Sequence, residues 1–347
     1  MRNIRCAVGF FLEALVATFL VAFTMPIRSA RIACLVLLFG VAATVSKVQA
    51  QTAFSFLRLD PSARAASLGG AFSAVFDDDV NALFYNPALL NDSMHRALSV
   101  SYLNHVAGVN GGFVAHARHV DGLGTLGAGL RYVGWGRLDG YDQEGNETGD
   151  FGAGDAALTL SFARAEQDRF QYGAGIHAAF SSIDTYSATA LAADVGVAYH
   201  FPDHLLTLSA SANNVGVVLD RLGASRDELP LDLRIGLSKR LAYVPLLISV
   251  SGYDLNRVGE DSGNGSFIAG AFRHVAFGGE FRFSEAFNVR LGYNHRRHQD
   301  LKMKSRLDLA GLGVGVGIKV STFRFDYAFS SWSSLGGLHR FTLRTVI

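Results

Sequence analysis

Residues 51–347 contain no cysteine, because the two cysteines of the chain, Cys6 and Cys34, both lie among the first 50 residues. This part of the chain can therefore form neither a disulfide nor a cysteine-based metal site. Charged residues make up only 18% of the sequence and the formal net charge is +1, so we expect no nucleic-acid partner. Proline is scarce, with 6 residues, whereas glycine reaches 38, a composition typical of long sheets whose backbones approach closely.

Long apolar runs are also missing after Ala50, where no stretch of about 18 residues is apolar enough for a helical membrane span. The first 50 residues have the features of an export signal. A basic segment, Met25–Arg31, precedes an apolar one, Ile32–Val45, and Val48 and Ala50 then supply small residues. This pattern predicts a signal peptide that is cleaved between Ala50 and Gln51.

A second apolar run, Cys6–Phe23, lies upstream of this signal and contains Glu13. Two apolar runs in tandem are compatible with a transmembrane hairpin. The fit of the second run to the signal-peptide pattern favours the alternative that translation begins at Met25 rather than Met1.

Apolar residues alternate with small or polar residues over many segments from Ala97 onward. In Ser321–Ser331, phenylalanine and tyrosine occupy every second position, while the positions between them hold Arg324, Asp326 and small residues. A period of two over about 10 residues is the pattern of a tilted membrane strand, with one face toward lipid and the other toward a lumen.

Fourteen such segments can be counted. They are Ala97–Ala107, Gly111–Val120, Gly124–Trp135, Gly154–Arg164, Phe170–Ile183, Ala188–His200, His204–Val215, Leu231–Leu241, Pro245–Leu255, Phe272–Phe283, Phe287–His295, Leu309–Lys319, Thr322–Trp332 and Gly337–Ile347.

The connections alternate in length, which distinguishes a membrane barrel from a soluble sandwich or solenoid. Every second connection is short, and four of the others are long polar loops, Gly136–Ala153, Gly216–Pro230, Asn256–Ala271 and Arg296–Asp308. Short periplasmic turns opposite long outer loops are typical of outer-membrane barrels. A sandwich also alternates, but it has no reason to collect its long loops at one end. We therefore predict an all-β protein with a 14-stranded antiparallel transmembrane β-barrel over residues 97–347, surrounded by outer-membrane lipids.

Residues 51–96 do not alternate. Pro61–Gly70 has the composition of a short helix that ends at two glycines, and the acidic run Asp77, Asp78 and Asp79 precedes a second apolar stretch. Acidic residues favour helix N-termini, so we prefer a helix start over a calcium loop for this run, which also lacks EF-hand spacing. The lumen of a 14-stranded barrel is wide enough to need filling, so we expect this segment to be an N-terminal plug.

The sequence of the plug resembles a known family. AVFDDDVNALFYNPALL, residues 74–90, is similar to the N-terminal hatch of FadL-type outer-membrane transporters, and its motif includes Asp77, Asp78, Asn86 and Pro87. FLRLDPSARAASLGGA, residues 56–71, looks like the PorV/PorQ branch of that superfamily, and RLGYNHRRHQDLK, residues 290–302, resembles its PorQ-like members. One departure is the C-terminus, which ends in Ile347 rather than the phenylalanine of many outer-membrane barrels.

The resemblance implies an outer-membrane component of the type IX secretion system of the Bacteroidetes, and not an enzyme. The PorQ-like barrels hold a PorZ-like surface protein in an attachment complex with PorU and PorV. That complex processes cargo and links it to lipopolysaccharide, and the protease is PorU, so the barrel needs no catalytic residue. No cofactor is implied.

The residues themselves also point to no catalytic or metal site. No G-x-S-x-G nucleophile motif is present. His116 and His119 lie three residues apart in a strand and so face opposite ways, and His295 and His298 flank two arginines whose charge disfavours a metal ion.

The loop after residue 295 is the candidate surface for a partner or for lipopolysaccharide. It carries five basic residues, Arg296, Arg297, Lys302, Lys304 and Arg306, against Asp300 alone. Such residues can bind lipopolysaccharide phosphates, contact a protein partner, or simply be solvated, and the sequence does not separate these possibilities.

We expect the charges on the inward faces of the strands to pair with one another or with the plug, because unpaired charges in a narrow lumen are costly. These charges are Arg131, Asp194, Arg234, Glu280, Arg282, Arg290, Arg324, Asp326, Arg340 and Arg344.

Three classes of function therefore remain. The first is docking of a surface protein in a secretion complex, and the alternative is a FadL-like outer-membrane channel for hydrophobic small molecules. The third, an outer-membrane enzyme, is the least favoured because the sequence shows no catalytic site. Inward faces of glycine, alanine, serine and paired charges favour docking over an apolar transport route.

Overall fold

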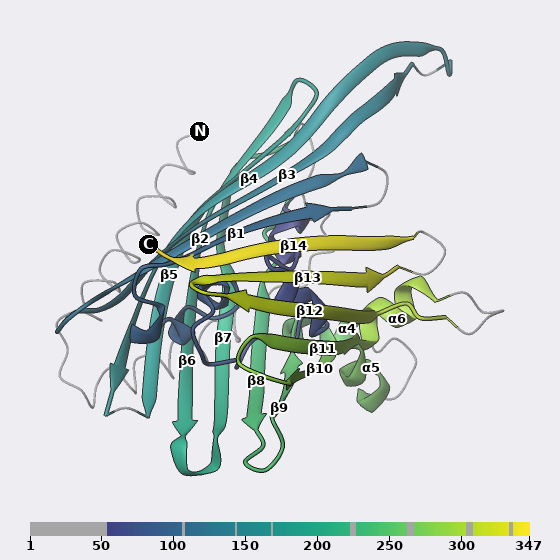
Figure 1. Ribbon diagram of the computed structural model, residues 1–347. Helices are drawn as coiled ribbons and strands as arrows, with labels where there is room; N and C mark the ends of the chain where they lie inside the picture. The colour runs from purple at the N-terminus through teal and green to yellow at the C-terminus, as the bar shows by residue number, and fades with distance from the viewer. Residues whose placement is uncertain are drawn as a thin grey trace. The chain divides into compact units, whose positions relative to one another are not determined.

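The alternating segments form a closed antiparallel barrel of 14 strands (Figure 1). The computed structural model describes residues 54–347 apart from 106–107, 143, 168, 223–226, 262–266, 303–307 and 333–335. The strands are β1 Ala97–Asn104, β2 Asn110–Val120, β3 Gly124–Tyr141, β4 Glu147–Glu166, β5 Phe170–Ile183, β6 Tyr186–Phe201, β7 Leu206–Asp220, β8 Asp232–Arg240, β9 Leu246–Gly252, β10 Val275–Arg282, β11 Phe287–Asn294, β12 Leu312–Val320, β13 Phe323–Ser331 and β14 Gly337–Val346.

Each strand pairs with its neighbours in the chain, and β14 closes the barrel by pairing with β1. The closing register runs from Ala97 opposite Val346 to Asn104 opposite His339. Closure leaves no free sheet edge along the barrel wall, which is the condition for strands to cross hydrocarbon. The predicted fold class and the number of strands are confirmed.

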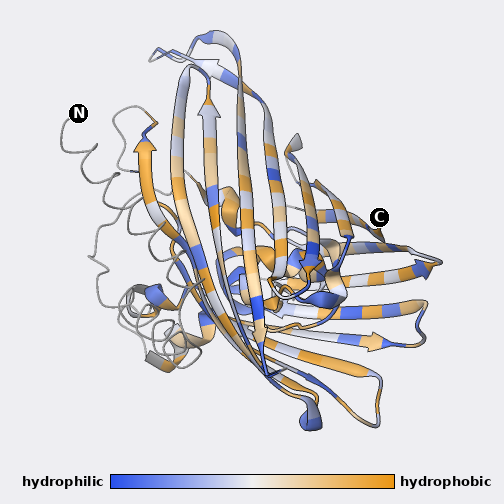
Figure 2. Cartoon of the chain, turned by 90° about the vertical axis from the view of Figure 1, so that its left-hand side faces the viewer, coloured by the Kyte–Doolittle hydropathy of each residue, from blue (hydrophilic) through white to orange (hydrophobic). Residues whose placement is uncertain are grey.

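The alternation sorts side chains between the two faces of the wall. In β1, Ser99 and Ser101 are buried toward the interior, whereas Val100 and Tyr102 are 47% and 49% exposed on the outside. Figure 2 shows the resulting change from apolar to polar positions along the strands. An apolar exterior of this kind is the lipid-facing surface of an outer-membrane barrel.

The prediction of a long loop over Gly136–Ala153 is wrong, because most of this segment is strand. β3 and β4 continue beyond their neighbours as a two-stranded ribbon that pairs Arg137 with Gly152 and Tyr141 with Glu147, after a register shift that follows Gly134. Figure 1 shows this hairpin projecting past the other strands. Its glycines and acidic residues led to the prediction of a loop, but the two strands satisfy each other's backbone groups without any apolar face.

The other long connections also hold regular structure. β7 runs on to Asp220, and the connection after β9 contains η7 Leu255–Arg257, α4 Val258–Asp261 and α5 Phe267–Arg273. The connection after β11 begins with α6 His295–Leu301, which Asn294 caps by accepting a hydrogen bond from the backbone N–H of Arg297. Short turns connect the strands at the opposite end, as expected.

The segment before β1 folds into short helices inside the ring of strands (Figure 1). They are η1 Ser55–Arg58, α3 Ala63–Ser67, η2 Val80–Phe84, η3 Pro87–Leu89 and η4 Asp92–Met94. Apolar residues of α3, η2, η3 and η4 form a buried cluster with wall residues such as Ala115, Ala198 and Leu247, and those of η1 belong to a second cluster. None of the helices in the described part of the chain has the length and apolar character needed to cross a membrane.

Candidate functional site

The plug is built from polar caps that the sequence places at the start of each short helix. Ser62 accepts a hydrogen bond from the N–H of Ala65 at the start of α3, and Asp79 accepts one from Asn81 at the start of η2. Gly69 and Gly70, both at positive φ, follow the end of α3. The expected helix before these glycines and the helix start after the aspartates are both confirmed.

Asn86 and Pro87, two residues of the plug motif, fix the plug against the wall. Asn86 caps η3 by accepting from the N–H of Ala88, and Pro87 occupies the first turn, where its missing N–H costs nothing. The Asn86 Nδ2 also donates to the backbone carbonyls of Val197 and Ala210, at 3.3 Å each. This side chain therefore joins the plug to β6 and β7.

Glycines in the wall allow the plug to approach the strands closely. A Cβ at Gly313 in β12 would lie 2.6 Å from the carbonyl oxygen of Ala66, and one at Gly292 in β11 would overlap the backbone of Leu68 and Gly69. The row of alternate glycines in β12 thus faces α3, as its spacing predicts. The plug and the wall are in backbone contact on this side of the lumen.

A buried network of ion pairs fastens the plug to strands β10 to β14. Arg64 of α3 donates to Glu280 of β10 at 2.7 Å, and also to Asp77 at 2.7 Å. Arg290 of β11 lies between two carboxylates: it donates to the same Glu280 at 2.7 Å and to Asp326 of β13 at 2.6 Å. Because these charges come in balanced pairs, the interior holds them without an isolated ion.

Two further arginines extend this network to the aspartates of the plug motif. Arg344 of β14 lies 3.1 Å from Asp79 and 4.0 Å from Asp78, and Arg282 of β10 lies 3.3 Å from Asp77. Burial alone would raise the pKa of Asp77, but the Arg64 guanidinium outweighs this effect and holds the pKa of that carboxyl well below its usual range.

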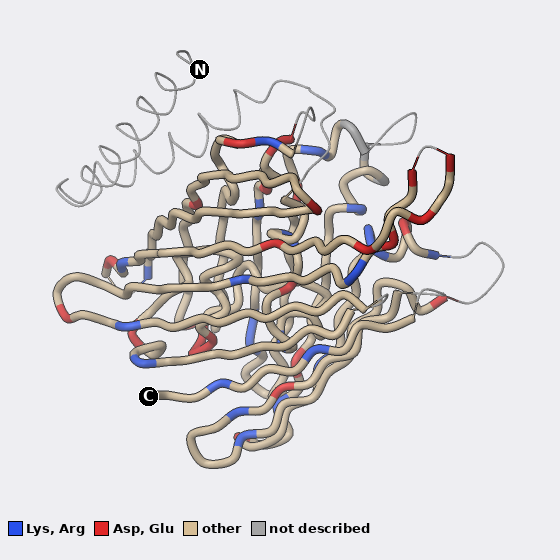
Figure 3. Tube along the Cα trace, turned by 90° about the horizontal axis from the view of Figure 1, so that it is seen from above, with Lys and Arg blue, Asp and Glu red and all other residues tan. Residues whose placement is uncertain are grey.

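The lumen charges pair largely as predicted. Arg234 bonds Asp232, Asp194 lies 3.3 Å from His177, and Arg131 donates to the carbonyls of Leu57 and Phe84 in the plug. Among the described residues, the structure places neither Arg324 nor Arg340 in a direct ion pair, although the charge of Arg340 acts on Asp60 of the plug. Figure 3 shows charged positions along the strands as well as in the connections.

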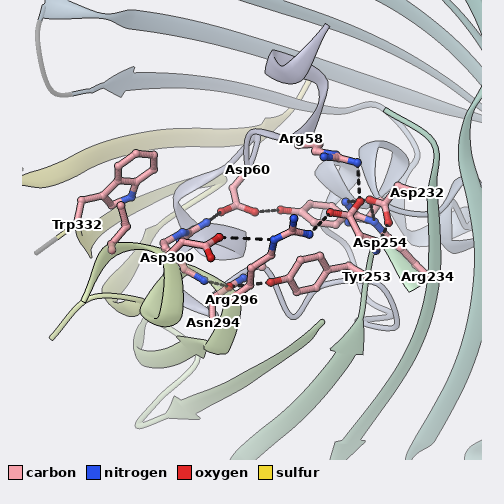
Figure 4. A pocket seen from close by; sticks show the side chains of 14 residues that line it. Arg58, Asp60, Asp232, Arg234, Tyr253, Asp254, Asn294, Arg296, Asp300 and Trp332 are labelled. Carbon is pink, nitrogen blue, oxygen red and sulfur yellow. Dashed lines mark hydrogen bonds and ion pairs between the residues drawn. The ribbon is translucent and has the colours of Figure 1, made fainter. Parts of the chain in front are cut away.

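At the opposite end of the plug, a polar cavity of about 340 Å³ opens between the plug, the ends of β8, β9 and β13, and α6 (Figure 4). The alternation of turn lengths predicts that this end is the outer end of the barrel. Four arginines and four aspartates line the cavity together with Tyr85, Tyr253, Asn294 and Trp332.

Ion pairs cross this cavity from the plug to the wall and to α6. Asp254, after β9, lies 2.9 Å from Arg58 of the plug and 2.9 Å from Arg296 of α6. Asp60 of the plug lies 3.4 Å from Arg297 of α6 and accepts a hydrogen bond of 2.6 Å from the Tyr85 hydroxyl.

The pKa values of these two carboxyl groups are shifted in opposite directions. Burial and the nearby Asp232 raise the pKa of Asp254. Burial would also raise the pKa of Asp60, but Arg297 and Arg340 outweigh it and lower that pKa.

The predicted basic loop is thus divided. Arg296 and Arg297 belong to α6 and turn into the outer mouth, with side chains 20% and 22% exposed. Lys302 is exposed just after α6, whereas Lys304 and Arg306 lie outside the described residues, as do Ala50, Gln51 and Met25. Of the three basic residues that the structure describes, two therefore line the mouth and one is exposed beside it.

Sequence reasoning missed the residues that complete the mouth and the network, above all Arg58, Asp60, Arg64, Asp232 and Asp254. Several of the pairs they form join residues far apart in the chain, such as Asp254 with Arg296 and Arg64 with Glu280, so no local motif reveals these pairs. Over the described residues, histidine, cysteine, aspartate and glutamate form no group that could hold a metal ion.

Comparison with known proteins supports the fold. No family model matches the chain, and no curated protein matches it either. Among solved structures, the toluene transporter TbuX of Ralstonia pickettii is similar with a TM-score of 0.57 and 14% identity, covering 84% of this chain and 99% of that one.

Two monoaromatic hydrocarbon channels are also similar. A deletion mutant of TodX gives a TM-score of 0.51 at 13% identity, covering 82% of this chain and 96% of that one. The channel CymD gives a TM-score of 0.50 at 11% identity, covering 82% of this chain and 95% of that one. The chain therefore has the fold of the FadL-like outer-membrane channels.

Proposed function

We propose that this chain is an outer-membrane barrel that docks a protein at the cell surface, as the PorQ-like barrels that it resembles in sequence do. The observation that carries the proposal is the tight attachment of the plug, which contacts the wall at glycines and is fastened by the ion pairs around Glu280. Above the plug, the mouth at Asp60 and Asp254 is lined by charges. An apolar solute on this path would displace water from charged groups, which is costly.

The β3–β4 hairpin supports a docking role as well. From Arg137 to Tyr141 and from Glu147 to Phe151, the two strands form ladder pairs only with each other, so both outer edges are free to accept a further strand. Near the tip, Asp142 accepts hydrogen bonds from the backbone N–H and side chain of Asn146, at 2.7 and 2.9 Å. A projecting ribbon with free edges is a surface that a partner strand can extend.

In this proposal the partner is a PorZ-like surface protein, in a complex that also contains PorU-like and PorV-like components and links cargo to lipopolysaccharide. Deletion of the gene should release the PorZ-like protein from the outer membrane into the medium and leave cargo uncleaved. Restoring the wild-type gene should reverse both effects. Normal retention of the partner in the deletion strain would refute the docking function.

A channel for hydrophobic small molecules is the second candidate, and the comparisons favour it over a secretion role. The similar solved structures carry the names of a toluene transporter and of hydrocarbon channels. In this chain, an apolar cluster at the outer end joins Phe54 and Phe56 of the plug to Val133, with Trp135 and Val218 packed against it. This cluster gives the outer end of the lumen an apolar side next to the charged mouth.

Uptake measurements separate the two functions. A channel predicts that the deletion strain takes up labelled toluene more slowly than its parent while the secretion of cargo stays normal. Docking predicts normal toluene uptake and defective secretion. The two outcomes differ in both readouts, so a single pair of strains decides between them.

A further inference from the structure

The charges that line the outer cavity cancel. Arg58, Arg234, Arg296 and Arg297 face the same number of carboxylates, and the lining comes from the plug, β8, the end of β11, the connections after β9 and β13, and α6 (Figure 4). A cavity with balanced charge gives no net Coulomb attraction to an ion of either sign. It is therefore a poor site for phosphate groups and for simple cations.

The hydrogen-bonding groups in the cavity are of two complementary kinds. The arginines and the Trp332 indole can only donate, and the aspartates, when ionised, can only accept. Arg58 Nε and Trp332 Nε1 are buried behind the lining and do not face the cavity, so the guanidinium and carboxylate groups supply its hydrogen-bonding surface. A hydroxyl group suits such a lining, because it donates to a carboxylate and accepts from a guanidinium at the same time.

Aromatic rings complete the lining. Tyr85, Tyr253 and Trp332 contribute apolar ring surface next to the charged groups. A purely apolar ligand would cover the rings but leave the charges without water, whereas a ligand with hydroxyls on an apolar ring framework satisfies both. The volume of about 340 Å³ is at the small end of the range for ligand sites.

We infer that this cavity binds a neutral saccharide unit at the outer face of the barrel. The inference does not depend on the proposed docking function, because a barrel with either function can hold it. Two sources supply this chemistry at the cell surface, the sugars of lipopolysaccharide and free saccharides in the medium. The shared feature is a ring with several hydroxyls and no net charge.

The test is calorimetric titration of the full-length processed barrel in detergent. The probes are neutral oligosaccharide released from the lipopolysaccharide of the same bacterium, its constituent monosaccharides, inorganic phosphate and toluene. We expect saturable binding of the oligosaccharide and no binding of phosphate or toluene. Binding should change less than twofold between low and high salt, because screening acts on charged ligands.

Two conservative variants place the binding in the cavity. Tyr253→Phe removes a hydroxyl that bonds Asn294 at 2.8 Å, and Asp300→Asn removes a charge at the rim of the cavity. Each should weaken binding about tenfold, the effect of losing one good hydrogen bond. Tyr243→Phe and Asp203→Asn, both in exposed turns at the other end of the barrel, are the matched controls and should bind as the wild type does.

The results separate the sources and can overturn the inference. Binding of the oligosaccharide alone assigns the site to lipopolysaccharide sugar, and binding of the monosaccharides as well assigns it to free saccharides. No saturable binding of any sugar, or sugar binding that the two cavity variants leave unchanged, rejects the site. Binding of phosphate or toluene in place of sugar rejects it too.

Discussion

Arg64 of the plug and Glu280 of the barrel wall form an ion pair in which both side chains are fully buried, with Arg64 Nε 2.7 Å from Glu280 Oε2. Arg290, directly across from Glu280 in the register of β10 and β11, bonds the same carboxylate. One wall carboxylate therefore holds an arginine from the plug and one from the neighbouring strand. Loss of the Glu280 carboxylate would leave the buried guanidinium groups of Arg64 and Arg290 without full charge compensation.

The first prediction concerns this carboxylate. Glu280→Gln should lower the free energy of unfolding by about 3–5 kcal/mol, because it leaves the buried guanidinium groups of Arg64 and Arg290 without this carboxylate. The measurement is the denaturant midpoint of the detergent-solubilised barrel. Glu285→Gln, in the exposed turn between β10 and β11, is the control. Equal midpoints for the two variants would contradict a structural role for the network.

The second prediction concerns the contact between plug and wall. Gly292→Ala places a methyl group against the backbone of Leu68 and Gly69 and should displace the plug, whereas a Cβ at Gly112 in β2 has open space. In planar bilayers, we expect the wild type and Gly112→Ala to remain closed and Gly292→Ala to show a leak conductance. Identical traces for both variants would show that the plug does not seal the lumen at Gly292.

The third prediction is a dependence on pH. The pKa of Asp77 is lower in the folded barrel than its unfolded value of about 3.9, mainly because Arg64 outweighs burial. The ionised Asp77 therefore contributes its full stability above about pH 4, and this contribution is lost as the pH falls below that value. Asp77→Asn should be less stable than the wild type at neutral pH, and the difference should shrink in acid. A difference that stays constant from neutral to acid pH would exclude this linkage.

The sequence predicts the wall of the barrel far better than its interior. Strand alternation is a local signal of period two, so it locates strands such as β13 within a few residues. The β3–β4 ribbon does not show this alternation, because neither face of the two strands beyond Gly134 is buried. The row of glycines in β12 did predict close packing, since its spacing alone shows that these residues share a face.

The outer mouth could not be predicted in the same way. Arg296 and Arg297 stand out in the sequence as charges, but their partners Asp254 and Asp60 come from a different connection and from the plug. A sequence shows that a charge is present and not which opposite charge it meets. The basic loop therefore looked like an exposed surface, although its first two arginines line a cavity.

The fourth prediction concerns processing. Phe54 is fully buried in the lumen, only a few residues after the predicted cleavage site that follows Ala50. We expect the intact mass of the outer-membrane form to match a chain that begins at Gln51. A mature protein that retains Cys34 would be incompatible with this cleavage.

The last prediction concerns orientation in the membrane. Residues 51–347 contain no cysteine, so single cysteines can be introduced without background in the processed chain. Lys302, exposed just after α6, should lie outside the cell, and Glu285, in the short turn between β10 and β11, should face the periplasm. On whole cells, a maleimide too large to cross the outer membrane should label Lys302→Cys and not Glu285→Cys, whereas both should react after the cells are broken. The reverse labelling pattern would mean that the barrel has the opposite orientation in the membrane. The charged cavity between the plug and α6 would then face the periplasm.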